Sequence, residues 1–145
     1  MNKILLKRAT LKNIKEVADL EKLASSRTYS GRVTEDEVKK FIKNQFVFLI
    51  MNQGKVVGLV AYTIIKKIVH FNGLVISPKF RRLGFAKQTL LLVLRKISKY
   101  PRIELVVHPH NNPALVLYLS LNFIIESWKN NYFGDGEPRL MLIKK

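Results

Sequence analysis

The segment most suited to binding a ligand is the short basic turn from Pro78 to Ala86, which joins an apolar run to a helix. Gly84 permits backbone conformations that a side chain would forbid, and the first N–H groups of the following helix lack acceptors within it. Those groups and the helix dipole favour an anion. We therefore expect a pyrophosphate to bind here, and three basic side chains add formal charge: Arg81, Arg82 and Lys87. The turn is neither a P-loop nor a dinucleotide fingerprint, because it lacks the Gly-Lys-Ser/Thr ending and two of the three glycines.

A second segment, Asn111 to Phe123, combines helix signals with a candidate proton donor. We expect Asn111 to cap the helix, Pro113 to be its first residue and Asn122 to take a left-handed conformation after its last turn. Tyr118 lies one turn after Ala114 on this helix, and its hydroxyl could act as a general acid. The alternative is a tyrosine that only packs in the core.

Together the two segments resemble the GNAT superfamily of N-acyltransferases. Arg81 to Ala86 matches its R/Q-x-x-G-x-G/A acyl-CoA motif, preceded by a hydrophobic-x-Pro-x-aromatic lead-in, Ile76 to Phe80. The second segment is similar to N-x-x-A-x-x-L-Y-x-x-x-G-F, with Asn122 in place of Gly. The resemblance implies a single-domain α/β fold and an N-acetyltransferase that uses acetyl-CoA as cosubstrate and no metal.

The resemblance also implies roles for individual residues. Tyr118 would protonate the departing thiolate while an amine attacks the thioester directly. The pantetheine arm would lie along Leu74 to Ile76, where two central strands separate, and an N–H near Ile76 would stabilise the oxyanion. The residues expected to hold the cofactor are Leu74, Val75, Ile76, Arg81, Arg82, Leu83, Gly84, Phe85, Ala86, Lys87, Asn111 and Ala114.

The general base is less well defined. Relatives carry a Glu either at the position of Val106 or at the position of His70. An imidazole has an unperturbed pKa of about 6.5, which suits a base near neutral pH, so His70 is the favoured candidate. Glu104, which lies two residues before Val106 on the same face of a strand, stays open as an alternative. So do His108, His110 and a water chain with no single base.

The acceptor amine is predicted from the tail and from one loop. Asn131 to Arg139 resembles the turn before the last strand in ribosomal-protein and other N-terminal protein acetyltransferases, although Pro138-Arg139 departs from the usual Asp-Ala. In those relatives this loop and the loop between the first two helices hold the acceptor, which makes Tyr132 and Tyr29 substrate-binding candidates. We expect a protein or peptide amine such as an N-terminus, with a small-molecule amine as the alternative.

Length and composition favour one domain over residues 1–145, because 48% of the residues are apolar and no run is long enough to span a membrane. The absence of cysteine excludes disulfides, cysteine zinc sites and a thiol nucleophile. We expect a cytoplasmic protein that is a whole gene product, either a monomer or a homodimer.

The charge is unusual: 26 basic residues against 10 acidic ones give a net charge of +16, and no acid lies between Val38 and Ile103. Such a field attracts anions. It could serve solubility alone, or contact nucleic acid or a ribosome. A basic nucleic-acid-binding module without catalysis is therefore a second alternative function.

The pattern of apolar residues and turn signals predicts the order β-α-α-β-β-β-α-β-α-β-β and a mixed central sheet. Asn72-Gly73 is interpreted as a bulge within a strand, although a hairpin turn is an alternative. The expected strands are Lys3–Ala9, Phe46–Asn52, Lys55–Ile65, Ile68–Ser77, Ile103–Val107, Phe123–Trp128 and Leu140–Ile143. The expected helices are Leu11–Ala24, one capped by Thr34 and ending near Asn44, Phe85–Lys99, and one from Asn111 to Leu121.

Overall fold

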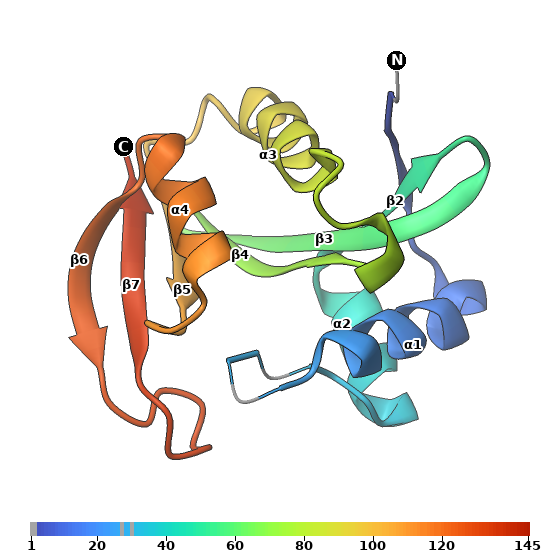
Figure 1. The fold of residues 1–145 in the computed structure, drawn as a ribbon, viewed down its shortest axis with the longest axis horizontal. Helices are drawn as coiled ribbons and strands as arrows, with labels where there is room; N and C mark the ends of the chain where they lie inside the picture. Colours follow the sequence, from blue (N-terminus) through green and yellow to red (C-terminus); the bar gives the residue numbers. More distant parts are fainter. Residues whose placement is uncertain (1–2, 27, 30) are drawn as a thin grey trace.

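The computed structural model describes residues 3–26, 28–29 and 31–145, and in this part of the chain seven strands form one sheet in the order β1-β2-β3-β4-β5-β7-β6 (Figure 1). Neighbouring strands are antiparallel except β4 and β5, which are parallel. The mixed sheet and the predicted element order are confirmed. The strands are β1 (Leu5–Arg8), β2 (Phe46–Asn52), β3 (Lys55–Ile65), β4 (Ile68–Ile76), β5 (Arg102–Val107), β6 (Ile124–Lys129) and β7 (Arg139–Lys144). The helices are α1 (Ile14–Ala24), α2 (Glu35–Asn44), α3 (Phe85–Lys96) and α4 (Asn112–Ser120), with 3-10 turns η1 (Leu11–Asn13) and η2 (Pro78–Phe80).

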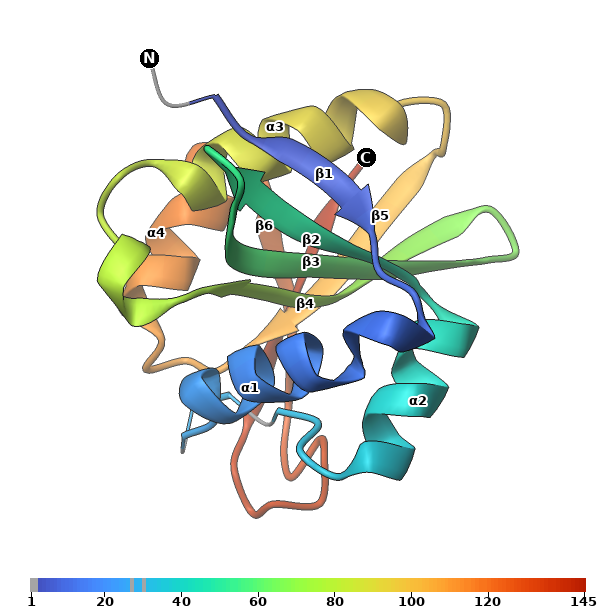
Figure 2. The same cartoon turned by 90° about the vertical axis from the view of Figure 1, so that its right-hand side faces the viewer.

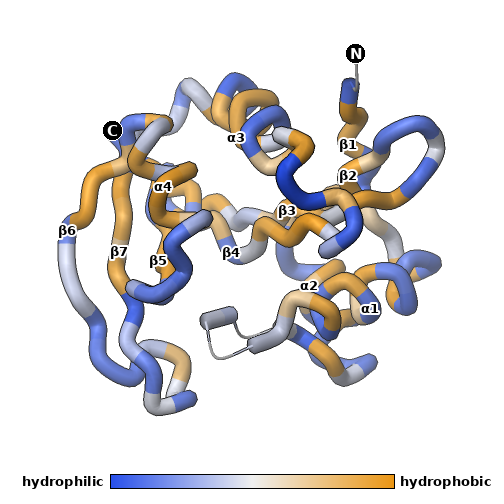
Figure 3. Tube along the Cα trace, viewed as in Figure 1, coloured by the Kyte–Doolittle hydropathy of each residue, from blue (hydrophilic) through white to orange (hydrophobic). Residues whose placement is uncertain are grey.

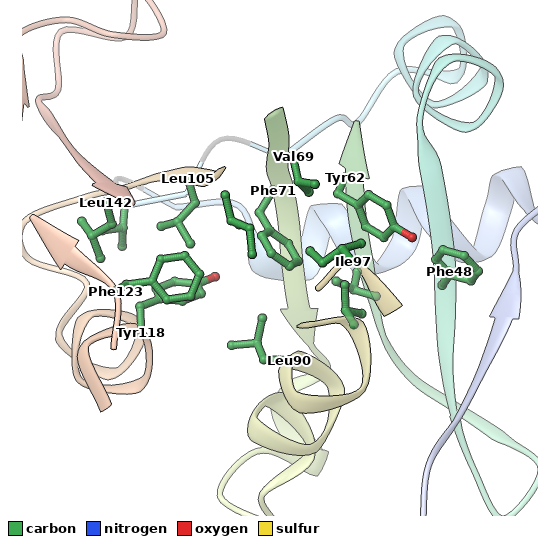
Figure 4. Close-up of a cluster of buried hydrophobic side chains, with 14 residues drawn as sticks. Phe48, Tyr62, Val69, Phe71, Leu90, Ile97, Leu105, Tyr118, Phe123 and Leu142 are labelled. Atoms are coloured by element: carbon green, nitrogen blue, oxygen red, sulfur yellow. The ribbon is translucent and has the colours of Figure 1, made fainter. Parts of the chain in front are cut away.

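Helices cover both faces of the sheet, α1 and α2 on one and α3 and α4 on the other (Figure 2). The side-chain alternation of the strands divides the core accordingly, since Val47 and Leu49 pack with α1 and α2 whereas Phe48 packs with α3. Figure 4 shows the cluster on the α3 and α4 side, where Leu90 and Tyr118 approach the sheet. The apolar strands at the centre contrast with strongly hydrophilic turns, above all the one before α3 (Figure 3).

Local signals at the helix ends are mostly confirmed. Thr34 caps α2 in a capping box with Glu37, and Thr10 caps η1, which precedes α1. Asn122 has φ +70°, and the N–H groups of Asn122 and Phe123 bond back to Leu119 and Tyr118, which satisfies the last carbonyls of α4.

The expected start of α4 is wrong in two details. Asn111 precedes the helix, but its side chain makes no capping hydrogen bond, because its backbone (φ −84°, ψ 73°) departs from the extended conformation that aims a cap at the helix. The first helical residue is Asn112, so Pro113 takes the second position.

Several ends of helices and strands also shift by one to three residues from their expected positions. The helix α3 ends at Lys96 because the chain turns at Ile97 to Tyr100, and β7 extends from Arg139 to Lys144.

Two irregularities of β4 open the sheet. In the pairing with β3, Ala61 lies opposite Gly73 and Tyr62 opposite Phe71, so Asn72 is an extra residue and the predicted bulge is confirmed. On its other side β4 pairs with β5 only from Ile68 to His70. From Phe71 onward the two parallel strands separate, and the carboxyl half of β4 has one edge without a strand partner in the described chain.

Candidate active site

The turn before α3 has the geometry of an anion-binding loop. Gly84 has φ +82°, a left-handed conformation that favours glycine, and a Cβ placed there would meet no atom within 4 Å. The backbone around it is therefore open. The Arg81 Nε donates to the Ile76 carbonyl at 3.2 Å, which ties the turn to the end of β4. The first N–H groups of α3 face no internal acceptor, so a phosphate can bind them.

A large cavity of about 720 Å³ extends from this turn along the free edge of β4 to α4. Among the expected cofactor residues, only Leu83 is missing from its lining, and its side chain is 51% exposed. The other residues expected to hold the cofactor therefore all lie around one cavity. Those that line it are Leu74, Val75, Ile76, Arg81, Arg82, Gly84, Phe85, Ala86, Lys87, Asn111 and Ala114.

Backbone N–H groups of β4 point into this cavity. The Ser77 N–H bonds to the Val57 carbonyl of β3 at 2.8 Å, and successive N–H groups of a strand point to opposite sides. The N–H groups of Leu74 and Ile76 therefore point away from β3, toward the gap left by β5. This gap is where an extended ligand could pair with β4 as a further strand.

A smaller cavity of about 160 Å³ lies beside the first and is lined by His70, Glu104, Val106 and Tyr132. The two cavities share part of their lining: Thr28, Tyr29, Leu74, Asn111, Ala114 and Tyr118. A ligand in one cavity can therefore reach a ligand in the other at the level of Tyr118.

Tyr118 is buried at this junction. Only 8% of it is exposed, and its ring packs edge-on against Phe123 with 5.6 Å between the ring centroids. Figure 4 shows the hydroxyl directed away from α4 and toward β4. Burial raises the pKa of Tyr118 well above its ordinary value, so the phenol keeps its proton throughout the physiological pH range.

His70 lies at the last pair of the β4–β5 ladder, opposite Glu104, where the strands begin to separate. Its Nδ1 is 3.2 Å from Oε1 of Glu104, while the other oxygen of Glu104 accepts from the Arg102 Nε at 2.6 Å. Arg102 in turn contacts Glu126 on β6 at 2.8 Å. Because Nδ1 faces the Glu104 carboxylate, Nε2 is the ring nitrogen left for a substrate.

The other two histidines are placed differently. His108 is 1% exposed and lines the smaller cavity, but both ring nitrogens are engaged. Nδ1 accepts from the His110 N–H at 3.0 Å, and Nε2 lies 2.7 Å from Oε1 of Glu137. This arrangement leaves His108 no nitrogen to receive a proton from an amine. His110 lies outside the lining of both cavities and packs on His108 with 5.3 Å between the ring centroids.

Glu21 is a buried residue behind the site that the sequence analysis did not single out. It is fully buried, accepts from the Tyr29 hydroxyl at 2.6 Å and pairs with Arg32 at 3.0 Å. Arg32 also donates to the carbonyl of the bulge residue Asn72 at 3.0 Å. This network fastens the loop between α1 and α2 to the bulge of β4 and so places Tyr29 between the cavities. A signal existed, because Glu21 lies four residues after Val17 on the buried face of its helix.

The turn between β6 and β7 carries Tyr132, with Phe133 packed edge-on at 4.8 Å between ring centroids. Both line the smaller cavity. Arg139, which departs from the pattern of N-terminal acetyltransferases, is 2% exposed and lies under this turn. It donates to Asp135 at 3.0 Å and lies 5.0 Å from the centre of the Phe133 ring. Arg139 therefore stabilises the turn that closes one side of the smaller cavity.

Residues 13–123 match the sequence profile described as the Acetyltransferase (GNAT) family. The chain therefore belongs to the GNAT acetyltransferase family, and it is an acetyl-CoA-dependent N-acetyltransferase. No protein of curated function matches the sequence.

Solved structures share the fold at low identity. The ribosomal-protein-S18-alanine N-acetyltransferase from Escherichia coli has a TM-score of 0.81 at 17% identity, covering 99% of this chain and 92% of that one. Ard1 from Thermoplasma volcanium has a TM-score of 0.84 at 16% identity, covering 97% and 96% of the two chains. The PaiA N-acetyltransferase from Thermoplasma acidophilum, solved with coenzyme A, has a TM-score of 0.81 at 15% identity and covers 99% of each. In the described part of this chain, no helix has the length and hydropathy to cross a membrane.

Proposed function

We propose that this enzyme transfers an acetyl group from acetyl-CoA to a primary amine of a protein or peptide, such as an N-terminus. The observation that carries the proposal is the junction of two cavities at Tyr118, one along the free edge of β4 and one beside His70. Two of the similar folds support a protein acceptor, since they belong to the S18-alanine N-acetyltransferase and to Ard1.

Acetyl-CoA would occupy the larger cavity. Its pyrophosphate would bind the N–H groups around Gly84, with Arg81, Arg82 and Lys87 supplying charge. Its pantetheine arm would pair with the edge of β4, where the N–H groups of Leu74 and Ile76 point into the gap. Asn111 and Ala114 form the opposite wall, and the small Ala114 leaves room for the thioester.

The acceptor amine would enter the smaller cavity between Tyr29 and Tyr132 and reach the thioester carbonyl beside Tyr118. Nε2 of His70 would remove the proton of the attacking amine, and Glu104 would stabilise the imidazolium that forms. The new C–N bond makes a tetrahedral intermediate, whose oxyanion would be stabilised by the gap-facing N–H near Ile76. Its collapse breaks the C–S bond.

Tyr118 would then donate its proton to the leaving thiolate. A phenol whose pKa is raised is a weak acid, but the same burial disfavours a thiolate charge as well, so the proton transfer stays feasible. The products are the acetylated amine and coenzyme A, with no covalent enzyme intermediate. His70 would then release its proton to solvent and Tyr118 would take one up, which restores the enzyme for the next turnover.

An acceptor screen tests this proposal. Purified enzyme and acetyl-CoA would be incubated with a peptide panel varying the first two residues and with a panel of small amines, while thiol release and acceptor mass are measured. We expect the highest kcat/KM with a peptide whose free N-terminus is acetylated. N-terminally blocked peptides of identical sequence are the control. Faster turnover of small amines, whose compact size also suits a cavity of about 160 Å³, would reject the protein acceptor.

A further inference from the structure

Two basic side chains lie on aromatic rings at the C-terminal end of α3. The guanidinium carbon of Arg8 is 4.9 Å from the centre of the Phe46 ring and 5.7 Å from that of Phe48. The ammonium group of Lys96 is 4.6 Å from the centre of the Phe48 ring. Contacts of this kind hold the cations in place without neutralising them.

The rings belong to a row across β2 and β3. Phe46 and Phe48 both stack on Tyr62, at 5.2 Å and 6.1 Å between ring centroids. The row lies on the α3 side of the sheet, and its outer member Phe46 is 37% exposed. Just beyond that end, the Lys99 ammonium lies 5.4 Å from the centre of the partly exposed Tyr100 ring. We call Arg8, Phe46, Lys96, Lys99 and Tyr100 the α3-end surface.

The positive charge of this surface is not balanced locally. In the described chain, the ion pairs between side chains use other cations, namely Arg32, Lys39, Arg102, Arg139 and two histidines. The hydrogen bond of Arg8 goes to a neutral carbonyl, that of Gln45, at 3.3 Å. The turn between β3 and β4, Lys66-Lys67, lies at the same end of the molecule as the C-terminus of α3 and adds two exposed cations (Figure 2).

We propose that the α3-end surface binds single-stranded nucleic acid. Fixed, unpaired cations match a ligand with regularly repeated phosphates, and exposed aromatic edges among them suit unstacked bases, which cannot be reached in a duplex. This is an additional binding property of the acetyltransferase and does not depend on its acceptor. It differs from the pyrophosphate site, since the length of α3 separates the two by about 18 Å. It also lies on the opposite face of the sheet from α1 and α2.

Fluorescence anisotropy with a labelled single-stranded RNA of about 12 nucleotides, long enough to span such a surface, tests the proposal on the full chain. Saturating coenzyme A would be present throughout, so that the pyrophosphate turn is occupied. The variant R8Q/K96Q/K99Q removes three charges from the α3-end surface. The matched control K12Q/K15Q/K40Q removes three exposed charges from η1, α1 and α2.

We expect the α3-end variant to bind at least tenfold more weakly than wild type at moderate salt. The slope of log affinity against log salt should fall by about 2, which corresponds to three lost phosphate contacts on a single strand. The control variant should bind within about threefold of wild type, because only distant charge is lost. F46A, which removes a ring without a charge, should weaken binding and leave the salt slope unchanged. Thiol release by all variants should match wild type, which separates this proposal from the acetyltransferase mechanism.

Several outcomes would overturn the inference. Competition between RNA and coenzyme A would place the RNA on the pyrophosphate turn. An equal loss in both triple variants would mean that only net charge matters. Equal affinity for a duplex of the same sequence would show that unstacked bases do not contribute to binding. Binding to vesicles of anionic phospholipid without binding to RNA would assign the surface to a membrane.

Discussion

His70 and Glu104 form the last pair of the parallel ladder between β4 and β5, with Nδ1 and Oε1 3.2 Å apart, at the point where the strands separate. The register that pairs these residues therefore also places them at the mouth of the gap that would receive the thioester. Because Arg102 holds the second oxygen of Glu104 at 2.6 Å, the carboxylate has one orientation toward the imidazole. The proposed base is thus fixed by the same backbone feature that creates the cofactor cavity.

Replacement of His70 by Gln should lower kcat/KM by about 100-fold or more, the usual contribution of a general base. Steady-state rates at varied acceptor concentration would measure this loss. His110→Gln, outside the lining of both cavities, should keep the wild-type kcat/KM. An unchanged kcat/KM in His70→Gln would point instead to Glu104 or a water chain.

Tyr118→Phe should reduce kcat about 100-fold while leaving the affinity for acetyl-CoA within a few fold, since the hydroxyl would act only on the leaving thiolate. Phe retains the ring that packs on Phe123, so the fold is preserved. Calorimetry of acetyl-CoA binding together with a thiol-release assay separates the two quantities. Full turnover by the variant would show that water protonates the thiolate and that Tyr118 serves only packing.

The same tyrosine makes the protein sensitive to alkali. Burial raises the pKa of Tyr118 in the folded state, so the folded protein keeps a proton that the unfolded chain releases near pH 10. Stability is therefore undiminished below about pH 10 and falls above it, by up to about 1.4 kcal/mol per pH unit for one group. Chemical denaturation between neutral pH and pH 11 should show this loss, and Tyr118→Phe should lose stability less steeply. Parallel curves for both proteins would contradict the pKa shift.

Much of this architecture is predictable from sequence because its signals are local. The turn at Gly84, the capping box at Thr34 and the left-handed Asn122 each depend on a few adjacent residues, and all three agree with the structure. The element order also follows from local periodicity. The family motifs are local too, and all the cofactor residues expected from them except Leu83 line one cavity.

The features that the sequence did not predict depend on contacts between distant segments. The pairing of His70 with Glu104 requires the register of two strands, and the burial of Glu21 requires a partner that lies 11 residues away in a loop, Arg32. The expected cap at Asn111 was wrong for a similar reason, because its backbone has a non-extended conformation (φ −84°, ψ 73°) in which the side chain makes no capping hydrogen bond. Periodicity places Glu21 on the buried face of its helix but does not identify its partner, and local residue types do not set the register of two strands.

Gly84→Ala should weaken acetyl-CoA binding at least tenfold, because a methyl group would enter the open space in front of the helix N-terminus. The left-handed backbone, φ +82°, would also cost about 1 kcal/mol of stability. Gly54→Ala is the matched control, since Gly54 has φ +76° and equally open surroundings in the turn between β2 and β3. Both variants should lose similar stability in denaturation curves, while calorimetry detects weaker binding only for Gly84→Ala. Equal affinities of the two variants for acetyl-CoA would show that the pyrophosphate does not bind the turn at Gly84.

Glu21→Gln should destabilise the protein by about 3 kcal/mol, because it leaves Arg32 without its buried counter-charge. Glu35→Gln, which breaks the exposed pair with Lys39, should cost less than about 0.5 kcal/mol and serves as the control. The Glu21 network also tethers Tyr29 to the bulge of β4, so KM for the acceptor should rise more than KM for acetyl-CoA in conditions where Glu21→Gln is folded. Denaturation curves and two-substrate kinetics measure these effects. A loss of stability with both KM values unchanged would show that the network has only a structural role. The loop between α1 and α2 would then not contribute to binding the acceptor.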